Sequence, residues 1–418
     1  MRWGIVVVAA VLLAGCAGGD DDASDEPVPA VVTSGAAAAP ATTRPDTTSD
    51  TAAPHTTSDT AAGTVAPTTE PAQAYDFAAV QPIVDGFVAE HGLNGAGLVI
   101  VDADDGIVGE YYAGEFDADR ISFVASATKM VTAGVLMHLA DQGLLDPDQP
   151  IAEYVPWAAG QHPEITVAQM LSNSSGLVGL MPDPGYGPYV CQFVATEEIE
   201  ACAERVWTTP DDDADVVPPD TEYRYGGAQW QIAGAVAETV SGKPWAELLD
   251  DVYIGPCGVD TLGYNNHWTT LGGAGFSYPG DFDGDVSMLT PTENPHMEGG
   301  LYISPTDYAE LLLMHLRDGM CGDTQVLSPE SLAAMHADRT GQAYGGSSGD
   351  GTGYGLGWWI ARDGSQRITD PGAYGAVPWL DLDGGFGAYL VIEADAALGI
   401  QLAALLYEPV EEAVLANR

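Results

Sequence analysis

Runs of apolar residues separated by turn residues predict strands at both ends of the folded part of this chain. Residues 98–101 are four successive apolar residues, and the segment Asp-Asp-Gly at 104–106 separates them from Ile107 and Val108. This arrangement predicts a β-hairpin. A helix is expected before it, and a terminal helix from Val410. Further strands are predicted near the other end of the chain, at residues 357–360, 388–392 and 399–405.

The middle of the chain has the apolar spacing of helices. Residues 121–143 predict a long helix, with apolar residues three and four places apart and Gly143 as its C-terminal stop. Other helices are predicted at residues 166–171, 228–240 and 304–316. Strands at the two ends and helices between them indicate an α/β (α+β) fold, in which one sheet is built from both chain ends around an α-rich insertion.

The first residues have the pattern of an export signal. Met1 and Arg2 precede an apolar run at residues 3–14, which is the length of a signal-peptide core and too short to span a bilayer. The run ends in Leu-Ala-Gly-Cys at 13–16, which resembles the lipobox of bacterial lipoproteins. We therefore expect a lipoprotein signal peptide over residues 1–15 and a lipidated Cys16. The alternative is an ordinary signal peptide.

Residues 16–74 are rich in Thr, Pro, Ala and Asp and contain almost no large apolar side chains. Such a segment cannot bury enough surface to fold, so a disordered acidic tether is expected. The organisation predicted is a signal peptide (1–15), a tether (16–74) and one enzyme-sized domain (75–418). The domain is expected to be exported and held at the outer face of the cell membrane through Cys16.

Charge excludes one class of partner. The 418 residues include 61 acidic and 12 basic side chains, for a net charge of −49. Nucleic acid is excluded as a partner, because neutralising phosphates needs a Lys/Arg surface. Basic residues are so few that the chain holds only two lysines, Lys129 and Lys243.

Four cysteines follow Cys16: Cys191, Cys202, Cys257 and Cys321. An even number in an exported protein indicates disulfides. Of the three possible connectivities we favour 191 with 202 and 257 with 321, and the alternative is four free buried thiols. Neither spacing is that of a zinc site, and no metal or cofactor is expected.

A nucleophile motif lies in the segment predicted as the first long helix. Ser126-Ala127-Thr128-Lys129 is an S-x-x-K sequence, and positions i and i+3 share one face of a helix. A lysine whose pKa is lowered toward neutrality by burial and neighbours can take the proton of the serine, which makes the serine a nucleophile. The alternative is a surface lysine one turn after a serine.

Segments spread along the chain resemble one superfamily. They occur in the expected order, at residues 123–129, 143–150, 165–177, 225–242, 299–304 and 353–359. The chain from about residue 75 is similar to the serine β-lactamases, DD-peptidases and β-lactamase-like esterases, with the class C and family VIII esterase branch the nearest. The resemblance implies an antiparallel sheet flanked by helices and catalysis through an acyl-serine.

The resemblance also assigns roles to residues. Ser126 matches the acylated nucleophile, Lys129 its partner base, and Tyr225 the tyrosine that shuttles a proton to the leaving group. Gly227 stands where the family has a substrate-orienting asparagine.

The family's third motif begins with a cationic or neutral residue. Its counterpart here is the segment 370–373, so that residue has become Asp370, followed by Pro371 and Gly372. The N–H groups of Ser126 and Ala373 would hold the oxyanion.

Asp370 affects the expected substrate, because a carboxylate near the site repels substrate carboxylates. We therefore expect a small-molecule or peptide substrate whose ester or amide is neutral or carries a cation. The leading hypothesis is an exported, lipid-anchored serine hydrolase that acts through an acyl-Ser126 intermediate. A β-lactamase or D-Ala-D-Ala carboxypeptidase is the second hypothesis, and a catalytically inactive binding lipoprotein of the same fold is the third. The sequence makes no prediction of oligomeric state.

Overall fold

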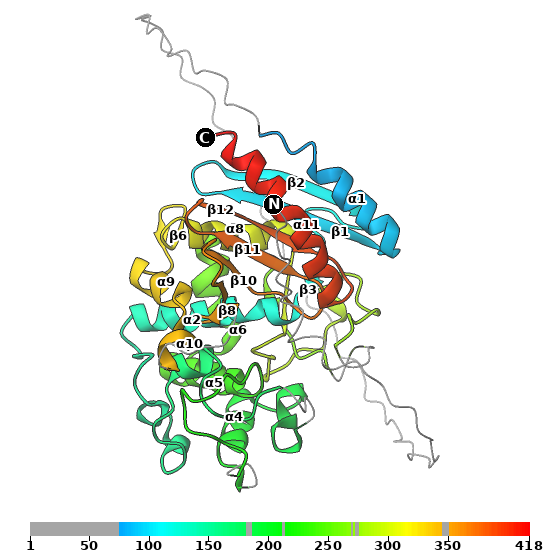
Figure 1. Ribbon diagram of the computed structural model, residues 1–418. Helices are drawn as coiled ribbons and strands as arrows, with labels where there is room; N and C mark the ends of the chain where they lie inside the picture. The colour runs from blue at the N-terminus through cyan, green and yellow to red at the C-terminus, as the bar shows by residue number, and fades with distance from the viewer. Residues whose placement is uncertain (1–74, 181–185, 211–213, 269–270, 272–275, 345–350) are drawn as a thin grey trace, which may run out of the picture. The chain divides into compact units, whose positions relative to one another are not determined.

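The structure, a computed structural model, describes residues 75–418 except 181–185, 211–213, 269–270, 272–275 and 345–350 (Figure 1). The described residues belong to one compact unit. The predicted signal peptide, Cys16 and the tether lie outside the described residues. Within the described part of the chain, no helix has both the length and the apolar character needed to cross a membrane.

The main sheet has seven strands in the order β2-β1-β12-β11-β10-β9-β8, and every neighbouring pair is antiparallel. The strands are β1 (Gly95–Asp102), β2 (Gly106–Gly114), β8 (Thr352–Tyr354), β9 (Trp359–Ala361), β10 (Arg367–Thr369), β11 (Val377–Asp381) and β12 (Phe386–Val391). The register of β1 against β12 runs from Gly97 opposite Val391 to Asp102 opposite Phe386. The prediction that both chain ends build one sheet is confirmed.

Helices cover both faces of this sheet. Because side chains alternate along a strand, Leu98 and Ile100 point to one face of β1 while Val99 and Val101 point to the other. The first pair packs in a core with α1 (Val80–His91) and α11 (Ala396–Leu415), which lie over the same face in Figure 1. The second pair belongs to the larger core, on the side where α8 (Pro305–Leu316) packs against β1 and β12.

The strand predicted at residues 399–405 is wrong, because this segment lies inside α11. The side chain of Asp395 accepts a hydrogen bond from the N–H of Leu398 at 3.0 Å and caps the helix N-terminus. Leu402, Leu406 and Val410 are then buried at helical spacing. A short apolar run does not distinguish a strand from a buried helix. In this segment the N-terminal cap by Asp395 favours the helix.

The helix predicted at residues 121–143 begins later than expected. Ser122–Phe123 form strand β3, which pairs with β5 (Leu301–Ile303) in a second sheet of order β3-β5-β4, where β4 is Gly263–Tyr264. A 3₁₀ turn over Ala125–Thr128 follows, and the α-helix α2 spans Lys129–Asp141. Pairing with β5 accounts for the start of this segment being extended.

The other predicted helices are confirmed with small changes at their ends. Thr166 and Gln169 form a capping box at the N-terminus of α3 (Val167–Leu171), and α5 spans Gln229–Ser241. The remaining helices and strands are α4 (Ile199–Trp207), α6 (Trp245–Leu249), α7 (Gly255–Cys257), β6 (Met320–Cys321), β7 (Thr324–Gln325), α9 (Pro329–His336) and α10 (Arg339–Ala343).

Two disulfides connect the helical part. Cys191 is bonded to Cys202, and Cys257 is bonded to Cys321. The first bond joins a 3₁₀ segment to α4, and the second joins α7 to β6. The favoured connectivity is confirmed, and the alternative of free thiols is excluded.

Candidate active site

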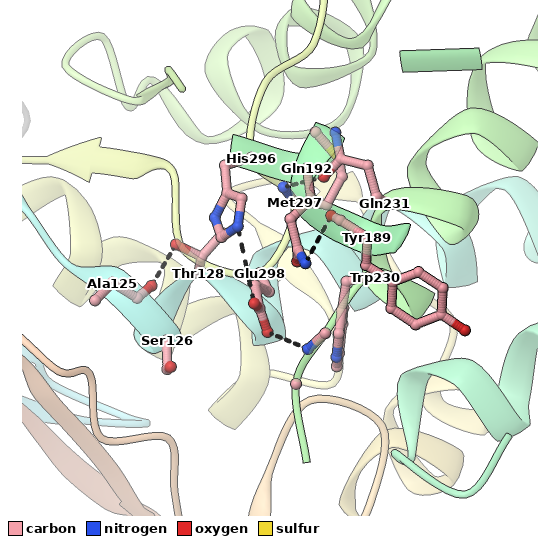
Figure 2. Close-up of polar contacts among 12 residues, drawn as sticks. Ala125, Ser126, Thr128, Tyr189, Gln192, Trp230, Gln231, His296, Met297 and Glu298 are labelled. Carbon is pink, nitrogen blue, oxygen red and sulfur yellow. Dashed lines mark hydrogen bonds and ion pairs between the residues drawn. The ribbon is translucent and has the colours of Figure 1, made fainter. Parts of the chain in front are cut away.

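Ser126 lies at the junction between strand β3 and helix α2. The preceding residue, Ala125, has a φ of 47°, in the left-handed region that costs a non-glycine residue about 1–2 kcal/mol. This conformation is held from both sides, since the Thr128 hydroxyl donates to the Ala125 carbonyl at 2.5 Å (Figure 2) and accepts from the Leu301 N–H at 3.1 Å. Ser126 is partly exposed, whereas the residues on either side of it are buried. The turn therefore presents one hydroxyl to solvent.

Lys129 begins α2 and is completely buried. Its Nζ lies 3.2 Å from Ser126 Oγ, 3.0 Å from the carbonyl oxygen of Glu298 and 3.4 Å from Oε2 of the Glu298 side chain. The structure thus brings together the two residues of the S-x-x-K motif. The alternative of a surface lysine is excluded.

The pKa of Lys129 does not follow the expectation from sequence. Burial by itself lowers it, but the interactions with neighbouring groups, among them the Glu298 carboxylate, raise it above its ordinary value. Lys129 is therefore an ammonium ion in the resting protein. It needs to lose a proton before it can accept one from Ser126.

Tyr225 completes the group around the nucleophile. Its hydroxyl interacts electrostatically with Ser126 and Lys129, and Lys129 Nζ lies 4.7 Å from the centre of its ring. The ring packs against Trp359 of β9, with centroids 5.4 Å apart. Burial raises the pKa of Tyr225, and the Lys129 cation lowers it only in part. The hydroxyl is therefore protonated at neutral pH and able to donate to a leaving group.

Asn173 positions the turn that follows Tyr225. Its side-chain oxygen accepts hydrogen bonds from the Gly226 N–H and the Trp230 indole N–H, both at 3.0 Å, and a third from Gln229 Nε2 at 3.0 Å. Gly226 and Gly227 both have positive φ, of 72° and 81°. No role was assigned to Asn173 from sequence, although it lies in the segment 165–177 that carries the family resemblance.

Glu298 is the principal site residue that sequence reasoning missed. It is 5% exposed, and Oε2 accepts a hydrogen bond from the Gly227 N–H at 3.0 Å besides pairing with Lys129. Its other oxygen, Oε1, lies 3.8 Å from Nε2 of His296, and the two side chains face each other in Figure 2. The one available signal was its place directly before the segment 299–304.

The loop of the third motif packs against the segment that carries Ser126. A Cβ on Gly372 would lie 1.8 Å from the carbonyl oxygen of Val124, so only glycine fits at this contact. Ala373 is partly exposed and packs against the cluster of Phe123 and Ala125. The sequence-predicted site residues of this loop therefore lie beside the nucleophile turn.

Asp370 is completely buried, and neither carboxylate oxygen makes a hydrogen bond of normal geometry. Burial raises its pKa well above the ordinary range, while Lys129 and the N–H groups of Met130 and Lys129 lower it only in part. The carboxyl is neutral and shielded from solvent. The charge repulsion expected from Asp370 is therefore not the reason to disfavour carboxylate substrates. The remaining reason to disfavour them is that this position lacks the cation that the family's third motif can supply.

A separate cleft of about 580 Å³ lies between α5, α6 and the small sheet. Its lining includes Trp245, Tyr264, Tyr302 and several glutamates, and it contains none of Ser126, Lys129 and Tyr225. The candidate chemistry is therefore at the nucleophile turn and not in this cleft.

Fold and site together define a serine hydrolase whose nucleophile is held between a lysine and a tyrosine. Residues 80–418 match the beta-lactamase family, and the chain belongs to that family. It is 29% identical over 303 residues to penicillin-binding protein 4 of Amycolatopsis lactamdurans, covering 68% of this chain and 75% of that protein. It is 24% identical over 298 residues to the 6-aminohexanoate-dimer hydrolase of Paenarthrobacter ureafaciens, covering 66% of this chain and 67% of that one.

The fold is similar to that of EstCE1, a hydrolase with promiscuous acyltransferase activity. The TM-score is 0.64 at 19% identity, and the match covers 81% of this chain and 98% of that one. The third hypothesis, an inactive binding lipoprotein, is not supported, because the chain is a serine hydrolase of the beta-lactamase family and its Ser126, Lys129 and Tyr225 are assembled.

Proposed function

We propose that this protein is an exported, lipid-anchored hydrolase that cleaves a neutral ester or amide through an acyl-Ser126 intermediate. The observation that carries the proposal is the contact of Ser126 Oγ with Lys129 Nζ at 3.2 Å, with the Tyr225 ring 4.7 Å from the same Nζ. In acylation, Lys129 as an amine takes the proton of Ser126 while Oγ attacks the acyl carbon. Tyr225 then gives its proton to the leaving group and is reprotonated by Lys129.

The oxyanion of the tetrahedral intermediate would be held by two backbone N–H groups, those of Ser126 and Ala373. Gly372 supports this role, because its close approach to Val124 brings the third-motif loop against the nucleophile turn. Donors fixed before the reaction stabilise the developing charge without reorganisation. Water would then attack the acyl-enzyme with the same residues acting in reverse.

The substrate class follows from the third motif and from position 227. Asp370 is buried and neutral where the family has a cationic or neutral residue, so no cation is supplied there for a substrate carboxylate. Gly227 has no side chain to orient a substrate amide, and its N–H is already used by Glu298. Both features favour small neutral esters over substrates that carry a carboxylate beside the scissile bond.

A β-lactamase or D-Ala-D-Ala carboxypeptidase is the second candidate function. It is favoured by the similarity to penicillin-binding protein 4 over 68% of this chain. Under this alternative a penicillin would acylate Ser126. Under the proposed function the acyl-enzyme forms far more readily from an ester.

The choice between the two candidate functions is tested by comparing kcat/KM for three substrates. These are p-nitrophenyl butyrate, the cephalosporin nitrocefin and a peptide ending in D-Ala-D-Ala. We expect the ester to exceed the other two by at least about tenfold, with all activity lost in Ser126→Ala. A preference for nitrocefin or the peptide would replace the proposed function by the second candidate.

Export and anchoring form the cellular part of the proposal. They are supported by the lipobox-like sequence that ends at Cys16 and by the two disulfides, which form in oxidising compartments. The full-length chain expressed in a bacterial host should fractionate with membranes. Cys16→Ala should release it into the soluble exported fraction, and an unchanged membrane fraction would contradict lipidation at Cys16.

A further inference from the structure

The proposed reaction needs an acceptor for a proton of Lys129, because Lys129 is an ammonium ion at rest. Three oxygens surround Nζ: Ser126 Oγ, the Glu298 carbonyl and Glu298 Oε2. Ser126 is the group to be deprotonated, and a backbone carbonyl is not a base of useful strength. The Glu298 carboxylate is the remaining acceptor, at 3.4 Å from Nζ. Contacts of this kind are often long in unliganded enzymes and shorten when substrate binds.

The surroundings of Glu298 hold its carboxylate in this place. The Gly227 N–H fixes Oε2 at 3.0 Å, and a Cβ on Gly226 would lie 2.7 Å from the same oxygen. The two glycines after Tyr225 thus leave the space that the carboxylate occupies and supply the hydrogen bond that orients it. Gly227 stands at the position of the family's asparagine, and in this chain its backbone N–H orients the Glu298 carboxylate.

Other titratable groups near the pair do not replace Glu298. His296 faces Oε1, and burial lowers its pKa well below the ordinary value, with His267 and Lys129 contributing, so it is neutral. Asp370 approaches Lys129 from the third-motif loop, but among the ion pairs of the described residues Lys129 pairs with Glu298 and not with Asp370. The Tyr225 hydroxyl is protonated and is itself a proton donor in the reaction.

We propose that Glu298 is the positioning residue that accepts a proton from Lys129 through Oε2 and so converts Lys129 into the amine that deprotonates Ser126. This inference rests on the proposed function. The ion pair of ammonium and carboxylate becomes a neutral amine and carboxylic acid without a net change of charge. The amine then takes the Ser126 proton, and Tyr225 and Lys129 pass a proton to the leaving group. The pair returns to its ionic form when Lys129 takes its proton back from Glu298.

Low-dielectric surroundings favour this exchange, because a buried ion pair loses the hydration that stabilises its charges. Lys129 is 0% and Glu298 5% exposed. Burial raises the pKa of the Glu298 carboxyl in spite of the neighbouring Lys129 cation, which makes it a stronger proton acceptor than an exposed glutamate.

The test is the pH dependence of inactivation by a fluorophosphonate, which reacts with an activated serine and needs no knowledge of the natural substrate. In the wild-type protein the rate should rise with pH through the pKa of Glu298 and then level off. In Glu298→Gln the amine can form only when Lys129 loses its proton to solvent. We therefore expect inactivation at pH 7 to fall by about 10²-fold, the size of a general-base contribution, and to recover as the pH rises toward 10.

Matched variants separate this role from a structural one. Glu298→Gln keeps the shape of the side chain and an oxygen for the Gly227 N–H, and thermal melts will report its folding. Glu298→Asp keeps a carboxylate, so its acidic limb should stay near that of the wild type while its rate is lower. Glu238→Gln removes a different, partly buried carboxylate, which accepts a hydrogen bond from the Trp245 N–H, and the pH profile of this variant should match that of the wild type.

The inference would be overturned if the inactivation rate of Glu298→Gln rose with pH over the same range as that of the wild type, or at lower pH. A shift to lower pH is the result expected if Glu298 only raised the pKa of Lys129. Absence of labelling in the wild-type protein would instead contradict the proposed function itself, so the two failures are distinguishable.

Discussion

The side-chain oxygen of Asn173 accepts a hydrogen bond from the backbone N–H of Gly226, one residue after the tyrosine of the site. The same oxygen receives the indole N–H of Trp230. Asn173 lies just after the end of α3 and thus holds the turn that carries Tyr225. This buried oxygen therefore helps to position the proton donor.

Asn173→Ala should therefore affect both stability and activity. It leaves the N–H groups of Gly226 and Trp230 buried without an acceptor, at a cost of about 1–3 kcal/mol per unsatisfied group, and it puts alanine at a φ of 55°. We expect a lower free energy of unfolding in urea and a lower kcat, with a smaller change in KM. Wild-type stability and kcat in this variant would show that Asn173 does not position the turn.

Tyr225→Phe isolates the hydroxyl from the ring. The ring packing on Trp359 is kept, so the melting temperature should stay close to that of the wild type. The kcat for an ester should fall by about 10²–10⁴, the range of general acid–base contributions. A leaving group of low pKa, such as p-nitrophenolate, should reduce the loss because it needs less protonation. An equal loss for good and poor leaving groups would contradict the role of Tyr225 as the acid.

Two contacts of Lys129 show how far the site can be predicted from sequence. Ser126 and Lys129 are three residues apart, and a helical or 3₁₀ turn brings such positions together whatever the rest of the fold. Glu298 is 169 residues from Lys129 along the chain. Its contact depends on the register of β5 against β3, which no local pattern reveals. The charge state of Lys129 could not be predicted for the same reason, because it depends on Glu298.

The fold shows the same limit. The hairpin at the start of the domain and the helix at α5 follow from periodicity and turn residues. The segment 399–405 was placed in a strand because a short buried apolar run is common to both structures, and the capping side chain of Asp395 is a weaker signal. The pattern of strands at both chain ends predicted one sheet, and the family resemblance implied that it is antiparallel, but neither predicted its strand order.

Asp370 makes stability depend on pH. Its pKa is raised in the folded protein, whereas in the unfolded chain it is near 3.9. The unfolded chain therefore releases a proton that the folded protein keeps, and this group lowers the free energy of unfolding as pH rises above about 4 toward its folded-state pKa. Asp370→Asn removes this dependence. The variant should gain more in melting temperature at pH 8 than at pH 5, and an equal change at both pH values would contradict a neutral, buried Asp370.

The two disulfides should contribute unequally to the free energy of unfolding. Cys257 and Cys321 are separated by 64 residues, and Cys191 and Cys202 by 11. The loop-closure model gives about 4 kcal/mol for the longer loop and about 3 kcal/mol for the shorter one. Paired Cys→Ser replacements compared by urea unfolding should show a larger loss for Cys257/Cys321. A larger loss for Cys191/Cys202 would show that packing around that bond outweighs loop closure.

The central claim is that Ser126 is an activated nucleophile, and intact-mass analysis after exposure to a fluorophosphonate tests it most directly. The wild-type protein should gain the mass of one adduct, and Ser126→Ala, with an unchanged melting temperature, should gain none. Peptide mapping should place the adduct on Ser126. A folded wild-type protein that gains no adduct, or a Ser126→Ala variant that is labelled equally, would contradict the account.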